Sequence, residues 1–124
     1  MMASFHVREE DGIHRVEEII TDLCIIMDFG NLEKLRLVST ATEMVRLHLE
    51  HFGGSEIHFE LIEESDRQGL KLMFSFRGGI HKAIEDGTVL KELLPAKRRL
   101  SEDKLKEIQL IFSQISEQEK IDLI

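Results

Sequence analysis

The stretch Ile57–Phe76, with the sequence IHFELIEESDRQGLKLMFSF, decides the fold. In each half of it, apolar side chains alternate with mostly polar ones, first at Ile57, Phe59 and Leu61 and then at Leu70, Leu72, Phe74 and Phe76. Residues 65–69 between the halves include serine, aspartate and glycine, which are typical of turns. The two-residue period on both sides of a turn predicts a β-hairpin with one apolar face.

Two amphipathic helices are predicted before the hairpin, after a short strand at residues 4–9. The first helix is capped by Asp11 and places apolar residues three or four apart, at Ile13, Val16, Ile20, Leu23 and Met27. The second begins near Asn31 and stops at Gly53-Gly54. Its predicted buried stripe consists of Leu35, Val38, Thr42, Val45, Leu49 and Phe52.

The segment after the hairpin is predicted to be mainly helical. Residues 80–86 are interpreted as a short helix, a loop follows around Pro95, and Ser101 caps a last helix. The apolar stripe of this last helix consists of Leu105, Ile108, Phe112 and Ile115. The order of elements predicts an α/β fold, an α+β sandwich with helices packed on one face of a mixed sheet, and residues 1–124 as one domain.

Composition and charge narrow the possible functions. The formal net charge of −8 disfavours nucleic acids and anionic membranes as partners, and residues 97–99 are the one short basic run. The first ten residues do not read as a secretory signal, and no apolar run is long enough to span a bilayer. Cys24 is the only cysteine, so no disulfide forms within the chain, and we expect a reducing, cytoplasmic location.

Three further stretches follow one another with a characteristic order and spacing. Residues 39–47 read STATEMVRL, Gly53-Gly54 then precede the hairpin, and residues 69–80 read GLKLMFSFRGGI. Together they resemble the N-box helix, the hairpin and the Asp-x-Gly-x-Gly-Ile turn of anti-sigma-factor serine kinases, which belong to the histidine-kinase-like (GHKL) ATPases. The resemblance covers residues 30–87, about half of the chain, and implies a truncated GHKL ATPase-like fold with a helical C-terminus.

The departures from the family pattern all affect ATP binding. Glu43 stands where the family has its catalytic glutamate, but Leu47 replaces the asparagine that binds Mg²⁺ and cannot ligate a hard cation. Phe76 replaces the aspartate that accepts a hydrogen bond from adenine, and the glycine-rich turn has contracted to Gly78-Gly79. Residues 88–94 contain no lid glycine. These degenerate positions imply a pseudo-kinase with no cofactor, no metal and no catalytic residue beyond the remnant Glu43.

The resemblance therefore implies a non-catalytic regulatory domain that binds proteins and acts by sequestering a partner or competing with an active kinase. The partners that it implies are a STAS-domain antagonist, a phosphatase or a sigma factor of a bacterial partner-switching pathway. Two alternatives stay open: a divergent ATP-binding anti-sigma serine kinase that uses Glu43, and a structural homodimer without a small-molecule site.

Apolar residues that the predicted core does not explain are candidates for an interaction surface. With about 100° of rotation per helical residue, Leu37, Met44 and Leu47 lie well off the predicted stripe of their helix. Phe112 and Ile115 of the last helix also require an apolar surface. We expect these surfaces to meet in a homodimer; the alternative is that the last helix packs on its own chain.

Several other residues have an ordinary structural interpretation. Glu43 and Arg46 are spaced as a surface pair, and Ser39 and Thr40 are expected to bond locally within their helix. His48, His51 and His58 lack a recognised metal-ligand spacing and are expected at the surface, whereas Cys24 is expected to be a buried hydrophobic residue. The basic run 97–99 is either a contact for an acidic partner or phosphate or a solvated turn before a helix. The tail 121–124 is either a partner-binding motif or a frayed end that folds back.

Overall fold

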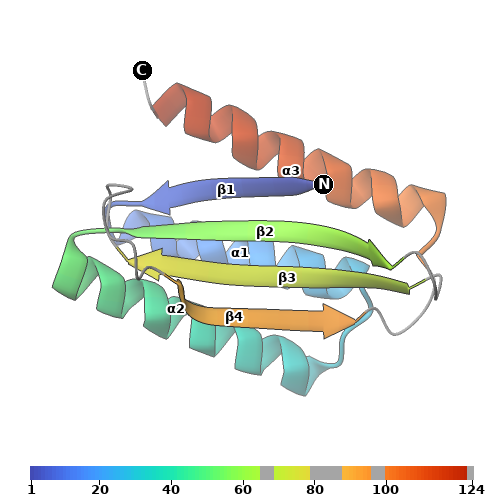
Figure 1. The fold of residues 1–124 in the computed structure, drawn as a ribbon, viewed down its shortest axis with the longest axis horizontal. Helices are drawn as coiled ribbons and strands as arrows, with labels where there is room; N and C mark the ends of the chain where they lie inside the picture. Colours follow the sequence, from blue (N-terminus) through green and yellow to red (C-terminus); the bar gives the residue numbers. More distant parts are fainter. Residues whose placement is uncertain (65–68, 79–87, 96–99, 123–124) are drawn as a thin grey trace.

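The predicted hairpin forms the centre of a four-stranded sheet in the computed structural model, which describes residues 1–64, 69–78, 88–95 and 100–122. The strands are β1 (Met2–Val7), β2 (Ser55–Glu64), β3 (Gly69–Gly78) and β4 (Thr88–Pro95), and they lie side by side in this order (Figure 1). All three pairings are antiparallel, so the prediction of a mixed sheet is wrong. The α+β class itself is confirmed.

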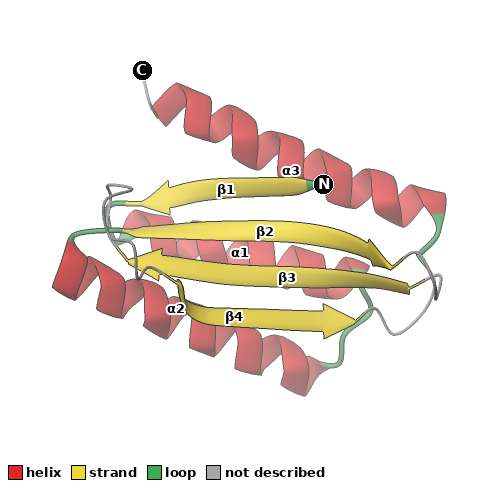
Figure 2. Cartoon of the chain, viewed as in Figure 1, coloured by secondary structure: helices red, strands yellow, loops and turns green. Residues whose placement is uncertain are grey.

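Helices α1 (Asp11–Ile26) and α2 (Asn31–Phe52) cover one face of the sheet, and α3 (Glu102–Asp122) lies along β1 and also contacts α1. None of the three described helices covers the opposite face, which we call the open face (Figure 2). None of the described helices is both long enough and apolar enough to cross a membrane.

The alternation predicted for the hairpin is confirmed. Ile57 and Phe59 of β2 and Leu72, Phe74 and Phe76 of β3 are buried toward the helices, with Phe59 in edge contact with Phe74. Their neighbours on the open face are half-buried or exposed. Met73 is an exception because it is buried but lies outside the main core cluster.

Two of the predicted helix ends are confirmed, but the cap predicted at Asp11 is wrong, because Glu10 is the N-cap of α1 and no described side chain caps this helix end. Gly53 ends α2 in the left-handed conformation, with a φ of 76° that favours glycine, as the Gly53-Gly54 pair predicts. The Ser101 hydroxyl accepts a hydrogen bond from the backbone N–H of Lys104 at 3.3 Å, which confirms the predicted cap of α3. The stripe of α1 is also buried as predicted, together with Ile19 and Cys24.

The structure tests only part of what was predicted for the segment after the hairpin. The loop predicted around Pro95 is wrong, because Thr88–Pro95 pairs with β3 as the edge strand β4. The helix predicted at residues 80–86, the basic run 97–99 and the end of the tail at residues 123–124 lie outside the described residues, and so does Gly79.

Candidate functional site

The stripe of α2 that is buried differs from the predicted one. The buried residues are Leu37, Ala41, Val45 and His48, whereas Leu35 is 58% exposed. With about 100° per residue, this stripe is rotated by roughly 80° from the prediction. The outward position predicted for Leu37 is therefore wrong. Met44 is partly buried against the core, and Leu47 is 48% exposed.

The residues that the resemblance assigns to ATP contacts are split between the surface and the core. Glu43 and Leu47 lie one turn apart on the exposed side of α2. Phe76 is only 2% exposed and belongs to the core beneath the helices, where it pairs in register with Ile57. The phenyl ring therefore contributes to the core and offers no acceptor for an adenine amino group.

The candidate interaction residues of α3 also belong to the core. Phe112 and Ile115 are buried, and the ring centroid of Phe112 lies 6.5 Å from that of Phe59. The structure thus gives α3 the intramolecular packing that was the alternative to a homodimer through this helix. Leu37, Phe112 and Ile115 are not accessible to a partner in this fold, while Met44 and Leu47 remain candidates.

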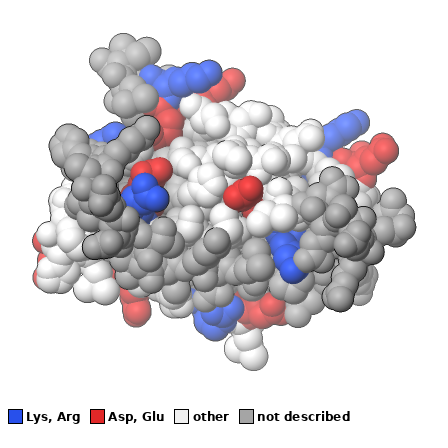
Figure 3. Space-filling model, in the orientation of Figure 1, with Lys and Arg blue, Asp and Glu red and all other residues white. Residues whose placement is uncertain are grey.

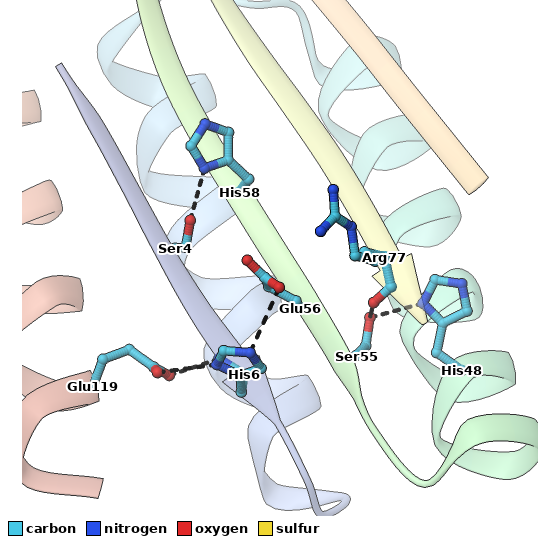
Figure 4. A network of polar contacts seen from close by, with 8 residues as sticks. All are labelled: Ser4, His6, His48, Ser55, Glu56, His58, Arg77 and Glu119. Atoms are coloured by element: carbon cyan, nitrogen blue, oxygen red, sulfur yellow. Dashed lines mark hydrogen bonds and ion pairs between the residues drawn. The ribbon is translucent and has the colours of Figure 1, made fainter. Parts of the chain in front are cut away.

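His48 is buried in a small polar network, and the prediction of a surface position is wrong for this histidine. The Ser55 hydroxyl donates to the backbone carbonyl of Arg77 at 3.3 Å and lies 2.8 Å from His48 Nδ1 (Figure 4). Ser55 therefore accepts from Nδ1–H, which leaves the lone pair on Nε2. That atom is buried without a hydrogen-bond partner in the part of the chain that the structure describes.

Gly78 allows α2 to pack closely on the end of β3 beside this network. A Cβ atom at Gly78 would lie 2.5 Å from Phe52 Cδ2 and 3.2 Å from His48 Cδ2. The Phe52 and His48 rings meet edge to face with their centroids 5.9 Å apart. The glycine that the resemblance assigns to a nucleotide turn thus has a packing role in this chain.

Burial lowers the pKa of His48 below its ordinary value of 6.5. The unfolded chain consequently binds a proton at this residue at a higher pH than the folded chain does. We expect the free energy of unfolding to fall as the pH decreases below about 6.5, and this contribution to end below the folded-state pKa. Urea denaturation at pH 7 and pH 5 measures the effect.

His48→Gln removes the titrating group and keeps a donor for Ser55, so it should flatten this pH dependence. His51→Gln is the matched control, because His51 is exposed one turn away on the same helix. If the free energy of unfolding depends on pH equally in the wild type and in His48→Gln, the lowered pKa of His48 is not the cause of this dependence.

A second polar network lies on the open face and joins α3 to the sheet. The Glu119 carboxylate accepts from the backbone N–H of His6 at 2.6 Å and lies 3.2 Å from His6 Nδ1. The other ring nitrogen of His6 lies 3.6 Å from Glu56 Oε2. Figure 4 shows His6 between the two carboxylates, so the ring links α3, β1 and β2.

A second histidine, His58, lies two residues beyond Glu56 along β2 on the same face of the sheet. His58 Nδ1 lies 2.7 Å from the Ser4 hydroxyl, and Nε2 lies 3.6 Å from Glu60 Oε2. Ser4 and His58 are register partners on β1 and β2, which explains their contact. A hollow of about 240 Å³ lies beside them and is lined by Glu56, His58, Ser75 and Arg77.

The described residues around this hollow come from β2 and β3. Uncharged residues occupy much of the middle of the open face, and most of the visible charged side chains lie toward its margin (Figure 3). The alternation in the sequence predicts that the polar residues of β2 and β3 face outward. It does not predict that His6 and Glu119, which are 113 residues apart, meet.

Two classes of site have little support in the described residues. No group of three or more His, Cys, Asp or Glu side chains there is arranged to hold a metal ion. Cys24 is buried as predicted, and burial raises the pKa of its thiol to about 11. Since thiolates rather than thiols are nucleophiles, Cys24 is suited to packing.

The comparisons with known proteins add no relative to these observations: no family model, no curated protein and no solved structure matches this chain.

Proposed function

We propose that this chain is a non-catalytic regulatory domain that binds a protein through the solvent-facing side of α2. The observation that carries the proposal is a set of exposed leucines on this helix: Leu32 is 84% exposed, Leu35 58% and Leu47 48%. With about 100° per residue, the three fall within an arc of roughly 120°. Exposed apolar side chains on one helix face are typical of docking surfaces.

The ATP-binding alternative would need a metal ligand on the same helix face. Glu43 lies on it, and one turn later it has Leu47 in place of a metal ligand. An aliphatic side chain favours a protein contact over a hydrated cation. The buried Phe76 also argues against the adenine contact, because it supplies no acceptor.

The resemblance to anti-sigma-factor serine kinases suggests the kind of partner. We propose that the partner is a STAS-domain antagonist, a phosphatase or a sigma factor. The chain would act by sequestering this partner or by competing with an active kinase, and it would catalyse no reaction. A homodimer is the alternative use of the same surface, since exposed leucines on one copy complement those on another.

The test is calorimetric titration of purified STAS-domain, phosphatase and sigma-factor proteins from the same genome into this chain. We expect one of them to bind, and the double variant Leu35→Glu, Leu47→Glu to weaken binding at least about tenfold. Leu110→Glu is the matched control, because Leu110 is an exposed leucine on α3.

Light scattering of the free chain separates the homodimer from the partner complex. A dimer that Leu35→Glu, Leu47→Glu dissociates would favour the alternative. Failure of all three protein classes to bind a monomeric chain, or equal weakening by Leu110→Glu, would overturn the proposal.

A further inference from the structure

The hollow on the open face contains two opposite charges, Glu56 and Arg77, that no ion pair within the described residues joins. Glu56 and Arg77 are register partners on β2 and β3, and opposite charges at such positions commonly attract. Within the described residues no ion pair joins them, because the Glu56 carboxylate contacts His6 instead. Figure 4 shows Glu56 directed toward His6 and the Arg77 side chain lying over β3.

The Arg77 guanidinium makes no hydrogen bond or ion pair within the described part of the chain and is exposed at the hollow. A guanidinium presents its N–H groups in a planar fork that matches a carboxylate. Glu56 has the complementary property, because an ionised carboxylate only accepts. Ser75 adds a hydroxyl that can donate or accept, whereas both ring nitrogens of His58 already contact Ser4 and Glu60.

These charges restrict the ligand. A simple anion would be repelled by Glu56 and by the net charge of −8, and a simple cation would be repelled by Arg77. A molecule with a carboxylate and an ammonium group a few bonds apart can contact Arg77 with the first group and Glu56 with the second. The volume of about 240 Å³ is below the usual size of a site for drug-like molecules, so the ligand must be small.

We infer that the hollow lined by Glu56, His58, Ser75 and Arg77 binds a free α-amino acid, whose carboxylate contacts Arg77 and whose ammonium group contacts Glu56. The residues that line the hollow lie on the open face of the sheet, whereas α2 covers the opposite face (Figure 1). This inference is therefore independent of the partner proposed for α2, and either can fail without the other.

The test is a titration of the ¹⁵N-labelled chain with each of the twenty common L-amino acids at millimolar concentration, followed by NMR. We expect at least one to shift the backbone signals of His58, Ser75 and Arg77 saturably. Its deaminated and decarboxylated analogues, such as propionate and ethylamine for L-alanine, should bind at least about tenfold more weakly.

Variants locate the binding. Arg77→Gln and Glu56→Gln should each weaken the amino acid at least about tenfold, whereas Arg46→Gln, an exposed arginine on α2, should not. The analogue comparison uses the wild-type chain and does not depend on the folding of any variant. The inference is overturned if no amino acid binds saturably, if the deaminated analogue binds as tightly as the amino acid itself, or if Arg46→Gln weakens binding as much as Arg77→Gln does.

Discussion

Replacing Ile108 with aspartate is expected to lower the free energy of unfolding by about 4 kcal/mol or more, enough to unfold a domain of ordinary stability. Ile108 is 0% exposed and belongs to the core cluster that α3 shares with the sheet. A carboxylate at this position would be buried without a partner, which is among the most destabilising changes. Urea denaturation followed by circular dichroism measures the loss.

Leu110→Asp is the matched control for this prediction, because Leu110 lies two residues further along α3 and is 59% exposed. A surface substitution of this kind usually changes stability by less than about 0.5 kcal/mol. Similar stability of Ile108→Asp and Leu110→Asp would show that α3 is not docked on its own chain. The homodimer prediction for this helix would then regain its basis.

Phe76→Ala should lower the free energy of unfolding by about 3–5 kcal/mol, the usual loss for a buried aromatic side chain. The ring of Phe76 is buried beneath the helices beside Ile57. Phe52→Ala is the control, since Phe52 is half-exposed and should lose only about 1 kcal/mol of burial.

Chemical denaturation of both phenylalanine variants gives the comparison. Equal losses would contradict a core position for Phe76 and would make this residue accessible to a ligand.

The elements that the sequence predicted well are those with a strong local period. The hairpin, the stripe of α1 and the cap of α3 depend on neighbouring residues and turn chemistry, and all three are confirmed. The buried stripe of α2 was predicted wrongly because two of its core positions are Ala41, which is small, and His48, which is polar. Neither residue contributes to a pattern of large apolar side chains. Polar networks such as that of His48 and Ser55 become visible only when the chain is folded.

Features that depend on contacts between distant segments could not be predicted from local sequence patterns. Strand β4 has a short apolar run that periodicity alone does not distinguish from a loop or a helix, and the antiparallel sheet depends on pairings between distant segments. The hollow on the open face arises in the same way, because register brings Glu56 next to Arg77 and His58 next to Ser75. The outward position of these residues was predictable, whereas their proximity was not.

The central claim is that this chain binds a protein and not ATP, and calorimetric titration of the wild-type chain with Mg-ATP tests it most directly. Leu47 supplies no metal ligand and the buried Phe76 supplies no adenine acceptor, so we expect no saturable heat and no rise in melting temperature at millimolar Mg-ATP. Saturable binding that requires Mg²⁺ and raises the melting temperature would contradict the claim and favour the divergent kinase that uses Glu43.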